Sequence, residues 1–279
     1  EISRAFSKQN TIGFAISHSP KDQKDTLKQF ASFCWYYPDN DLCRRGNSYI
    51  YLNQYPTSRA PDAMIKNNVN PKLMTPLKML LNTTEEKVAT DVVFYTYAIL
   101  CSQVYLDEFE GALYTVNRAN MRPRIPFVKD ANAFRQLTAL GEKLAQLERQ
   151  DYQPENHMQF DIAAIQAQIP VGFRLKHTEQ PFDEENEIFV LSDGTVSIEI
   201  PCPLEIQRIN IAGYDILKNV WLKFNSYDFT HCPFAGDDLL GLLNLINKLV
   251  EYVDLVGDID IIMHEVIEGK YPLILPSRN

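Results

Sequence analysis

The chain has 279 residues, of which 45% are hydrophobic and 11% aromatic, a composition that suits a folded core and excludes a disordered chain. Its formal net charge of −9 excludes a protein that is basic throughout, as many nucleic-acid-binding proteins are. No apolar run approaches the roughly 18 to 20 residues of a membrane span, so we expect no membrane segment.

Short apolar runs separated by turn-forming residues begin the chain. Residues 11–16 and 49–52 are predicted strands, and residues 30–37 form an aromatic-rich run between them. Residues 56–76 are rich in proline and asparagine, which predicts a long connecting loop.

A proline-rich basic segment lies between two predicted helices. Residues 121–127 read Met-Arg-Pro-Arg-Ile-Pro-Phe, and the two prolines exclude a helix there; we call this segment the elbow. Before it, Thr83 opens a capping box, and apolar residues follow at helical spacing over residues 88–109. After it, residues 133–147 carry one apolar stripe, in which Gly141 allows close approach of a neighbouring segment.

The rest of the chain starts with a polar stretch, residues 150–158, which is predicted to be a linker. Alternation of apolar residues around an Asp-Gly turn predicts a β-hairpin over residues 188–200. A leucine-rich helix is expected over residues 239–256 and is expected to end at Gly257, with a short helix after it over residues 258–269.

These elements predict a mixed α/β (α+β) fold, with antiparallel strands around a central helix pair and a helical C-terminus. The polar stretch divides the chain into an N-terminal part, residues 1–149, and a C-terminal part, residues 150–279. We expect the two parts to form one composite domain.

Five cysteines are scattered along the chain without a CxxC pair, which fits reduced, buried thiols better than disulfides. They are Cys34, Cys43, Cys101, Cys202 and Cys232. Cys202, His231 and Cys232 are candidate zinc ligands. They lack the paired spacing of known zinc motifs, such as CxxC, so no metal site is predicted.

Motifs of catalysis are missing from the sequence. It contains no GxxxxGK or GxGxxG phosphate loop, no GxSxG elbow and no HExxH helix. One trace resembles the Asp…Glu-x-Lys pattern of metal-dependent nucleases, in Asp260, Glu268 and Lys270. That chemistry needs the Glu and Lys on a strand, whereas here they follow a predicted helix, so we expect a plain helix terminus and no catalytic residue.

Charge is distributed unevenly along the chain. Every charged side chain in residues 178–207 is acidic, whereas residues 43–78 and 118–135 are mostly basic. Arginine beside rigid proline loses little entropy on binding phosphate, and it can pair with guanine through two hydrogen bonds. The candidate DNA-contacting residues are Arg44, Arg45, Arg59, Arg118, Arg122, Arg124 and Lys129.

Each candidate has a plainer interpretation. The basic segments can be solvated surface without a partner, and Arg122 or Arg124 can form a buried salt bridge that holds the elbow. Five tyrosines interleave with Arg44 and Arg45, which suits nucleic-acid binding, although packing in a core or sheet explains most of them. They are Tyr36, Tyr37, Tyr49, Tyr51 and Tyr55.

Several separated segments together resemble one family. They are the tyrosine-rich residues 93–100, the elbow, the apolar stripe of residues 134–147, residues 211–214 with Trp221-Leu222-Lys223, and Cys43-Arg44-Arg45-Gly46 before residues 49–52. This pattern resembles the C-terminal target recognition (specificity) domain of type ISP restriction–modification enzymes and their helicase-like and adenine-specific DNA methyltransferase relatives. The resemblance extends over residues 11–256, with departures at Cys101, where the family usually has His, and in an insertion at residues 112–120.

The resemblance implies a domain that docks on duplex DNA and reads a short asymmetric site. Nuclease, ATPase and methyltransferase activities would lie in upstream domains, so this chain is expected to be no enzyme and to hold no cofactor itself. S-adenosylmethionine, ATP and Mg would serve the parent enzyme. The expected partners are duplex DNA and the methyltransferase and helicase domains of the same polypeptide, in the bacterial cytoplasm.

Two alternatives remain. The chain can be a protein-interaction or scaffold domain that packs on its own methyltransferase domain without binding DNA independently. A self-contained enzyme would need a pocket with converging titratable groups, which the sequence does not indicate. The first residues resemble no signal peptide, and a first residue of Glu suggests a piece of a longer protein.

Overall fold

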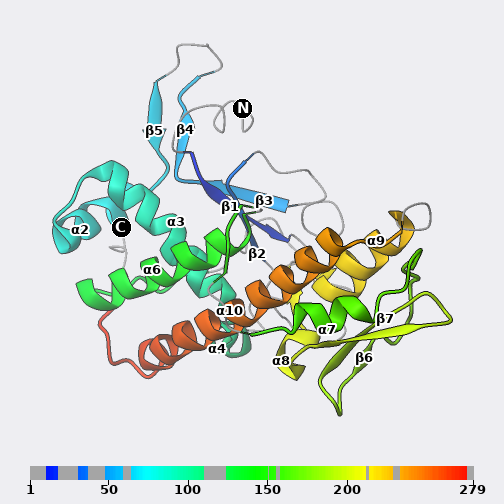
Figure 1. Cartoon of the computed structure of the whole chain (residues 1–279). Helices are drawn as coiled ribbons and strands as arrows, with labels where there is room; N and C mark the ends of the chain where they lie inside the picture. The colour runs from blue at the N-terminus through cyan, green and yellow to red at the C-terminus, as the bar shows by residue number, and fades with distance from the viewer. Residues whose placement is uncertain are drawn as a thin grey trace. The chain divides into compact units, whose positions relative to one another are not determined.

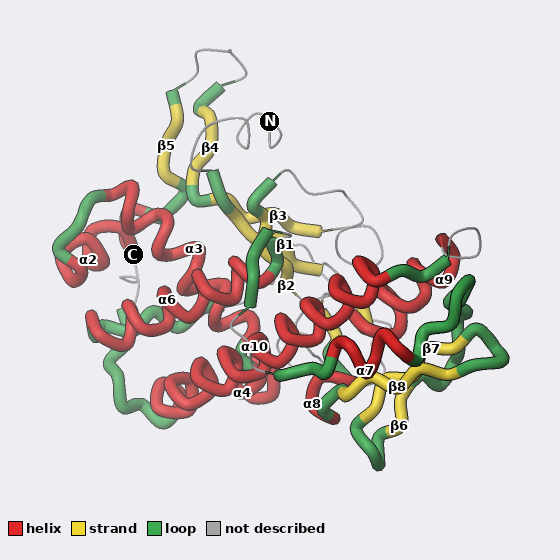
Figure 2. Tube along the Cα trace, viewed as in Figure 1, coloured by secondary structure: helices red, strands yellow, loops and turns green. Residues whose placement is uncertain are grey.

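The computed structural model describes residues 11–17, 31–36, 48–58, 64–109, 124–149, 151–154, 158–211, 214–228 and 233–274. These residues form the predicted mixed α/β fold, with small antiparallel sheets and a helical C-terminus (Figures 1 and 2). The chain divides into unit 1, Glu1–Gln150 with Leu255–Asn279, and unit 2, Asp151–Asp254. Among the described residues, no helix is long and apolar enough to cross a membrane.

The predicted N-terminal strands form a three-stranded antiparallel sheet in unit 1. Its strands are β1 (Gly13–Ser17), β2 (Ala31–Cys34) and β3 (Ser48–Leu52), in the order β2-β1-β3. The ring of Phe14 stacks on that of Tyr51, which lies directly opposite on β3, with centroids 5.3 Å apart.

The long loop expected over residues 56–76 is wrong. Two short strands, β4 (Gln54–Pro56) and β5 (Ile65–Asn67), pair antiparallel, and helix α2 (Pro71–Leu81) follows. Pro71 is the first residue of α2, a position that requires no backbone N–H, and Asn70 just before it caps the helix. The helix continues through an internal proline because three of its apolar residues, Met74, Leu77 and Leu81, are buried.

The helix expected over residues 88–109 is two helices, α3 (Glu85–Cys101) and α4 (Gln103–Glu108). Thr84, not Thr83, caps α3 by accepting from the Lys87 amide at 3.3 Å. Ser102 is extended and fully buried, and its hydroxyl accepts from the Tyr105 amide at 3.1 Å to cap α4. Ser102 therefore ends α3 and caps α4, where apolar spacing alone predicts one continuous helix.

The second predicted helix is present as α6 (Ala131–Leu147), which packs against α3. Gly141 makes this contact close, because a Cβ atom there would lie 2.0 Å from the Phe94 carbonyl oxygen. Just after α6, the Glu148 carboxylate accepts from the Ser32 hydroxyl at 2.6 Å, the Phe33 amide at 3.0 Å and the Tyr97 hydroxyl. The end of α6 is thereby tied to β2 and α3.

Unit 2 contains the predicted hairpin, β7 (Ile188–Ser192) and β8 (Ser197–Pro201), with β6 (Phe182–Asp183) beside β7. Asp193 closes the turn by accepting from the Thr195 and Val196 amides, each at 2.8 Å. The smaller elements are α7 (Ile162–Ala167), α8 (Leu204–Gln207), β9 (Asn210–Ile211), β10 (Tyr214–Asp215), the π-helical turn η1 (Ile216–Leu222) and α9 (Lys223–Asp228).

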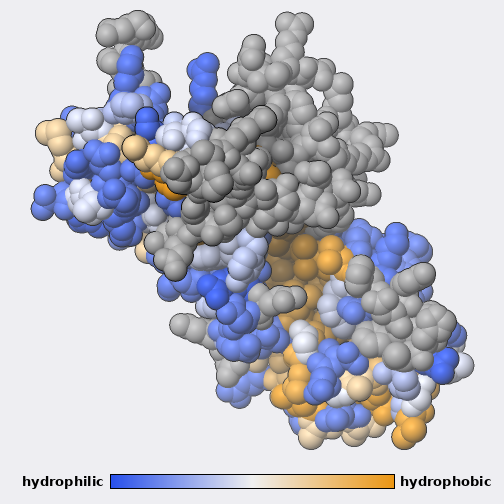
Figure 3. Space-filling view, turned by 90° about the horizontal axis from the view of Figure 1, so that it is seen from above, coloured by the Kyte–Doolittle hydropathy of each residue, from blue (hydrophilic) through white to orange (hydrophobic). Residues whose placement is uncertain are grey.

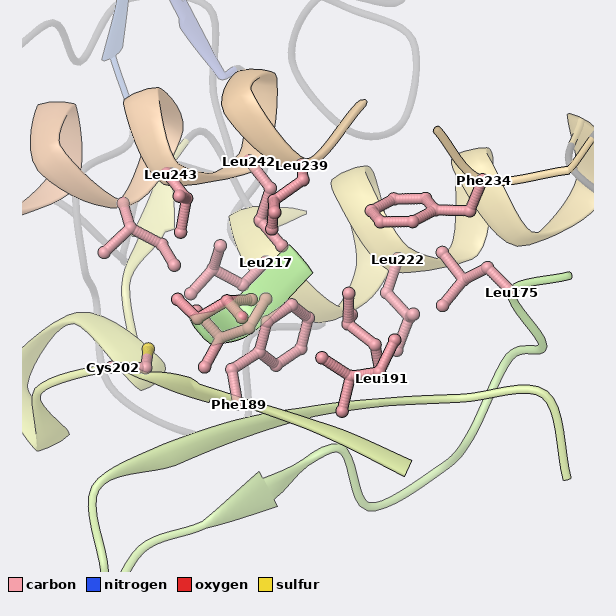
Figure 4. Packing of buried hydrophobic residues seen from close by; sticks show 14 of the residues in the cluster. Leu175, Phe189, Leu191, Cys202, Leu217, Leu222, Phe234, Leu239, Leu242 and Leu243 are labelled. Atoms are coloured by element: carbon pink, nitrogen blue, oxygen red, sulfur yellow. The ribbon is translucent and has the colours of Figure 1, made fainter. Parts of the chain in front are cut away.

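The core of unit 2 is built from aliphatic and Phe side chains. Phe189 and Leu191 of the sheet face Leu217 and Leu222 of the η1 turn and the leucines of the last helix (Figure 4). Phe234 lies against Phe173, with ring centroids 6.1 Å apart. One face of the β6-β7-β8 sheet is therefore buried in this core.

The last helix, α10 (Gly236–Ile267), is continuous, so the expected end at Gly257 and the separate helix over residues 258–269 are wrong. Glycine weakens a helix by roughly 1 kcal/mol, which is too little to break one that is buried on both sides of it. Leu255, Ile259 and Met263 continue the buried stripe through the glycine at a spacing of four.

Candidate nucleic-acid interface

The described part of the elbow, beginning at Arg124, forms no helix or strand and is held by tyrosine hydroxyls from the preceding helices. The Tyr95 hydroxyl donates to the Pro126 carbonyl at 2.6 Å and accepts from the Val128 amide at 3.2 Å. The Tyr105 hydroxyl donates to the Arg124 carbonyl at 3.2 Å. Burial raises the pKa of Tyr105 to about 12 and raises that of Tyr95 further, so both phenols remain protonated donors.

Aromatic stacking and the C-terminal segment complete the support of the elbow. The Tyr95 ring stacks on Phe134 and on Phe127, with centroids 4.4 and 5.2 Å away. The Ile274 amide donates to the Phe127 carbonyl and the Lys129 amide to the Pro272 carbonyl, both at 2.7 Å. The backbone of the elbow is therefore fixed from three sides within unit 1.

Two of the candidate contact residues lie in the described chain, and both side chains are exposed. Arg124 and Lys129 form no ion pair among the described residues, so a salt bridge of Arg124 that holds the elbow is not found there. The elbow is held through its backbone instead, and the Arg124 guanidinium is left at the surface. The other candidates lie outside the described residues: Arg44, Arg45, Arg59, Arg118 and Arg122.

Other basic residues of unit 1 have local partners. Lys78 pairs with Glu85 at 3.1 Å, Lys87 pairs with Asp91, and Arg135 donates to the Leu81 carbonyl at 3.2 Å. The Lys78 and Arg135 contacts join α2 to α3 and to α6, and the Lys87 pair lies within α3. Lys66 is exposed on β5.

Sequence reasoning missed the tyrosines that hold the elbow. Tyr95 and Tyr105 are predicted only as residues of a helix and of segments that resemble the family, yet both direct their hydroxyls to backbone groups of the elbow. A buried tyrosine needs a hydrogen-bond partner, and the proline-rich elbow offers carbonyl groups that no helix uses. That combination was the available signal. Among the interleaved tyrosines, Tyr36 and Tyr55 are exposed, at 77% and 42%.

The nuclease-like trace has a structural explanation. Asp260 accepts from the Ser102 hydroxyl at 2.6 Å and from the Val104 amide at 3.2 Å, so it holds the start of α4. Burial raises its pKa, and these hydrogen bonds oppose the shift. Lys270 pairs with Glu265. Asp260 is thus engaged in supporting the break between α3 and α4.

Cysteines and pockets provide no catalytic arrangement in the part of the chain that the structure describes. Cys34, Cys101 and Cys202 are buried and in no disulfide, as predicted, and burial raises the pKa of Cys202 to about 12. No group of three metal-ligating side chains occurs among the described residues; His231 and Cys232 lie outside them.

Unit 1 has a pocket of about 220 Å³ between Phe14, Val93 and the elbow residue Ile125. Unit 2 has a groove of about 670 Å³ between residues 153–162 and the first half of α10. Among the described residues, neither is lined by Asp, Glu, His, Lys, Arg or Cys. Apolar residues also form surface patches between hydrophilic ones, as one face in Figure 3 shows. The pocket of unit 1 and the groove of unit 2 therefore lack the converging titratable groups of an active site.

Comparisons with known proteins agree with this arrangement. The family model of the Type ISP C-terminal specificity domain matches residues 1–227. Two solved structures share the fold: an ATP-dependent Type ISP restriction-modification enzyme, LlaBIII, bound to DNA, and a DrdV–DNA complex solved by cryoEM. Their TM-scores are 0.54 and 0.55, their identities 15% and 18%, and the matches cover 89% and 88% of this chain.

The matched regions are 16% of the LlaBIII chain and 24% of the DrdV chain, so this chain spans a minor part of either. No curated protein matches the sequence. The family model covers most of the chain, including the sheet of unit 1, the elbow with its two helices and the hairpin of unit 2. The chain belongs to the Type ISP C-terminal specificity domain family.

Proposed function

We propose that this chain recognises the DNA target sequence for a restriction–modification enzyme. The observation that carries the proposal is the family match over residues 1–227, because a specificity domain selects the sequence on which its enzyme acts. The LlaBIII and DrdV structures, both described as complexes with DNA, support it by fold.

The elbow is the first proposed contact. Its backbone is held by Tyr95, Tyr105 and the C-terminal segment, so little entropy is lost when an exposed side chain binds a phosphate. Arg124 supplies the charge in the described part of the elbow, and Lys129 supplies a second charge just after it. We assign phosphate or base contacts also to five residues outside that part: Arg44, Arg45, Arg59, Arg118 and Arg122.

We infer that the chain itself catalyses nothing and binds no cofactor. The two uncharged hollows and the engagement of Asp260 in supporting α4 are consistent with this inference. The methyltransferase and helicase domains of the parent polypeptide would use S-adenosylmethionine, ATP and Mg. The parent enzyme would act in the bacterial cytoplasm, where its DNA substrate lies.

A second function is favoured for unit 2 by its charge. It has six Lys and Arg against 17 Asp and Glu, a net charge of −11. Such a surface is repelled by DNA and attracted to a basic protein surface. Unit 2 would then pack on another domain of the parent, as expected of a scaffold.

Binding of the chain to a fluorescent duplex pool, measured by anisotropy over a range of salt concentrations, tests the proposal. The triple variant Arg44→Ala, Arg45→Ala, Arg118→Ala should bind every duplex more weakly. Each phosphate contact that is lost should reduce the slope of log affinity against log salt by about 0.9. Lys223→Ala, at an exposed lysine of unit 2, is the control and should leave the slope unchanged. Equal binding by the triple variant and the unaltered chain at low salt would show that the contact surface is wrong.

Arg124→Ala separates a contact from a structural role. Because its side chain is exposed, the variant should melt at the temperature of the unaltered chain while it binds DNA more weakly. A lower melting temperature with unchanged affinity would instead identify Arg124 as a residue that stabilises the elbow.

A further inference from the structure

The β4–β5 hairpin of unit 1 is a two-stranded ribbon that extends away from the β2-β1-β3 sheet (Figure 1). Tyr55 lies directly opposite Lys66 in its register. Backbone bonds lengthen the ladder at both ends: the Asn68 amide donates to the Asn53 carbonyl, and the Thr57 amide to the Met64 carbonyl, each at 2.8 Å. We call residues 53–57 with residues 64–68 the ribbon.

Carboxamide side chains fix the base of the ribbon to unit 1. Gln54 donates to the Thr11 hydroxyl at 2.7 Å, and Asn68 donates to the Leu52 carbonyl at 3.0 Å. The Asn53 side chain accepts from the Ile12 amide at 3.1 Å. An isolated two-stranded hairpin is marginally stable in water, so these bonds give the ribbon a set direction.

The two faces of the ribbon differ. Directly opposed residues share a face and successive residues alternate, so beyond the buried Asn53 at the base one face carries five exposed residues: Tyr55, Thr57, Met64, Lys66 and Asn68. The opposite face carries Gln54, Pro56, Ile65 and Asn67, all of them half-buried. We call the exposed side the outer face.

The outer face combines apolar, hydroxyl, amide and cationic groups. Tyr55 is 42% and Met64 68% exposed, although nothing in a free hairpin requires large apolar side chains there. Lys66 carries the single charge of the ribbon, and the ribbon has no acidic residue. This composition suits a surface that is both polar and negatively charged.

The β7–β8 hairpin of unit 2 has the same two-stranded form with the opposite charge. Glu199 is exposed on its outer face, and every charged residue from 178 to 207 is acidic. Repulsion from phosphates disfavours contact between that hairpin and DNA, whereas the ribbon carries no acidic residue that phosphates would repel.

We propose that the outer face of the ribbon enters the major groove of duplex DNA and reads base edges. The major groove, about 12 Å wide, admits a two-stranded β-ribbon and exposes the O6 and N7 acceptors of guanine. Lys66 donates to these acceptors, Tyr55 places its hydroxyl beside them, and Met64 contacts the methyl group of thymine. The inference rests on the proposed function and names the element that carries out its sequence-specific part.

The first experiment measures sequence preference rather than affinity alone. Duplexes that the unaltered chain enriches from a randomised pool are compared with scrambled duplexes of the same composition. Lys66→Ala and Tyr55→Ala should each lower the ratio of the two affinities by about 10-fold, the range that loss of one base contact produces. Lys223→Ala, which removes the same charge from unit 2, should leave the ratio unchanged.

A second measurement identifies the groove. Binding of the unaltered chain should protect guanine N7, which faces the major groove, from methylation by dimethyl sulfate, and Lys66→Ala should restore the reaction at one guanine. Both variants should melt like the unaltered chain, because the substituted side chains are exposed.

Three outcomes overturn the inference, and they are distinguishable. If the unaltered chain selects a sequence and both variants select it equally well, the proposed function stands, but the ribbon does not read the bases. Protection of adenine N3 without guanine N7 places the contact in the minor groove and also rejects the ribbon. A chain that binds no duplex, or binds all duplexes equally, rejects the proposed function and the inference with it.

Discussion

Unit 1 and unit 2 carry very different charges within one chain. Unit 1 has 21 Lys and Arg against 19 Asp and Glu, a net charge of +2, while unit 2 has a net charge of −11. The overall value of −9 is therefore almost entirely a property of unit 2. An acidic isoelectric point does not argue against a DNA surface when the acidic residues are collected in another part of the molecule.

The cores of the two units differ in a related way. Unit 1 buries Tyr95, Tyr97 and Tyr105, whose hydroxyls bond the elbow or Glu148, whereas the core of unit 2 is built from Leu, Ile and Phe. A tyrosine brings a polar group to the edge of a core, so the packing of unit 1 also positions its surface.

The largest effect is expected where helices of unit 1 touch. Gly141→Ala places a methyl group 2.0 Å from the Phe94 carbonyl, so it should lower the free energy of unfolding by about 3 kcal/mol. Gly241→Ala, in α10 of unit 2, meets open space and should raise it by about 0.5–1 kcal/mol by favouring the helix. Urea unfolding measures the free energy of unfolding of both variants. Equal changes in the two would falsify the proposed difference in packing.

Loss of the hydroxyls that hold the elbow should have a smaller effect. Tyr95→Phe keeps the stacked ring but leaves the buried Val128 amide without its acceptor, at a cost of about 1–3 kcal/mol. Tyr105→Phe removes one bond to the carbonyl of exposed Arg124, at a cost of about 0.5–1 kcal/mol, because water replaces it. Chemical denaturation of both variants tests the order, and a greater loss in Tyr105→Phe would contradict it.

The two units should respond oppositely to acid. In unit 1, burial of the carboxyl group raises the pKa of Glu148. The stability that this shift gives the folded chain is therefore full below about pH 4.3 and is lost as pH rises through the folded pKa. In unit 2, hydrogen bonds from Val196 and Thr195 lower the pKa of Asp193 to about 2. The stability that Asp193 gives the folded chain is therefore full above about pH 3.9 and is lost as pH falls toward 2.

Carboxyl titrations followed by NMR measure both values directly. Asp193→Asn should remove the acid-dependent opening of the β7–β8 turn, detected by hydrogen exchange of the Val196 amide. An Asp193 that titrates near its ordinary pKa would show that the turn is not held by the carboxylate.

The smallest effect is expected from charge reversal on unit 2. Glu199→Lys should change DNA affinity by less than about two-fold at 0.15 M salt, because charges more than about 8 Å from DNA are screened. Lys66→Glu, its counterpart on the ribbon, should weaken binding by about 10-fold or more. A large gain in affinity for Glu199→Lys would place the acidic hairpin beside the DNA and remove the contrast between the units.

Local signals in the sequence were sufficient for the helix after the elbow, the N-terminal strands and the β7–β8 hairpin. Two prolines three residues apart disfavour a helix in the elbow, and strict alternation around Asp193-Gly194 specifies a hairpin by itself. The composition of the basic and acidic segments was equally visible. These features depend on residues that are close together in the chain.

The tertiary structure decided what depends on distant partners. Ser102 divides a helix because Asp260, 158 residues away, accepts its hydroxyl hydrogen bond, and α10 passes Gly257 because the stripe on both sides is buried. The Arg124 side chain is left exposed because Tyr95 and Tyr105 hold the elbow through its backbone. The sequence alone determines which residues can be buried or can form hydrogen bonds. The free energy that each such residue contributes depends on the neighbours that the fold places beside it.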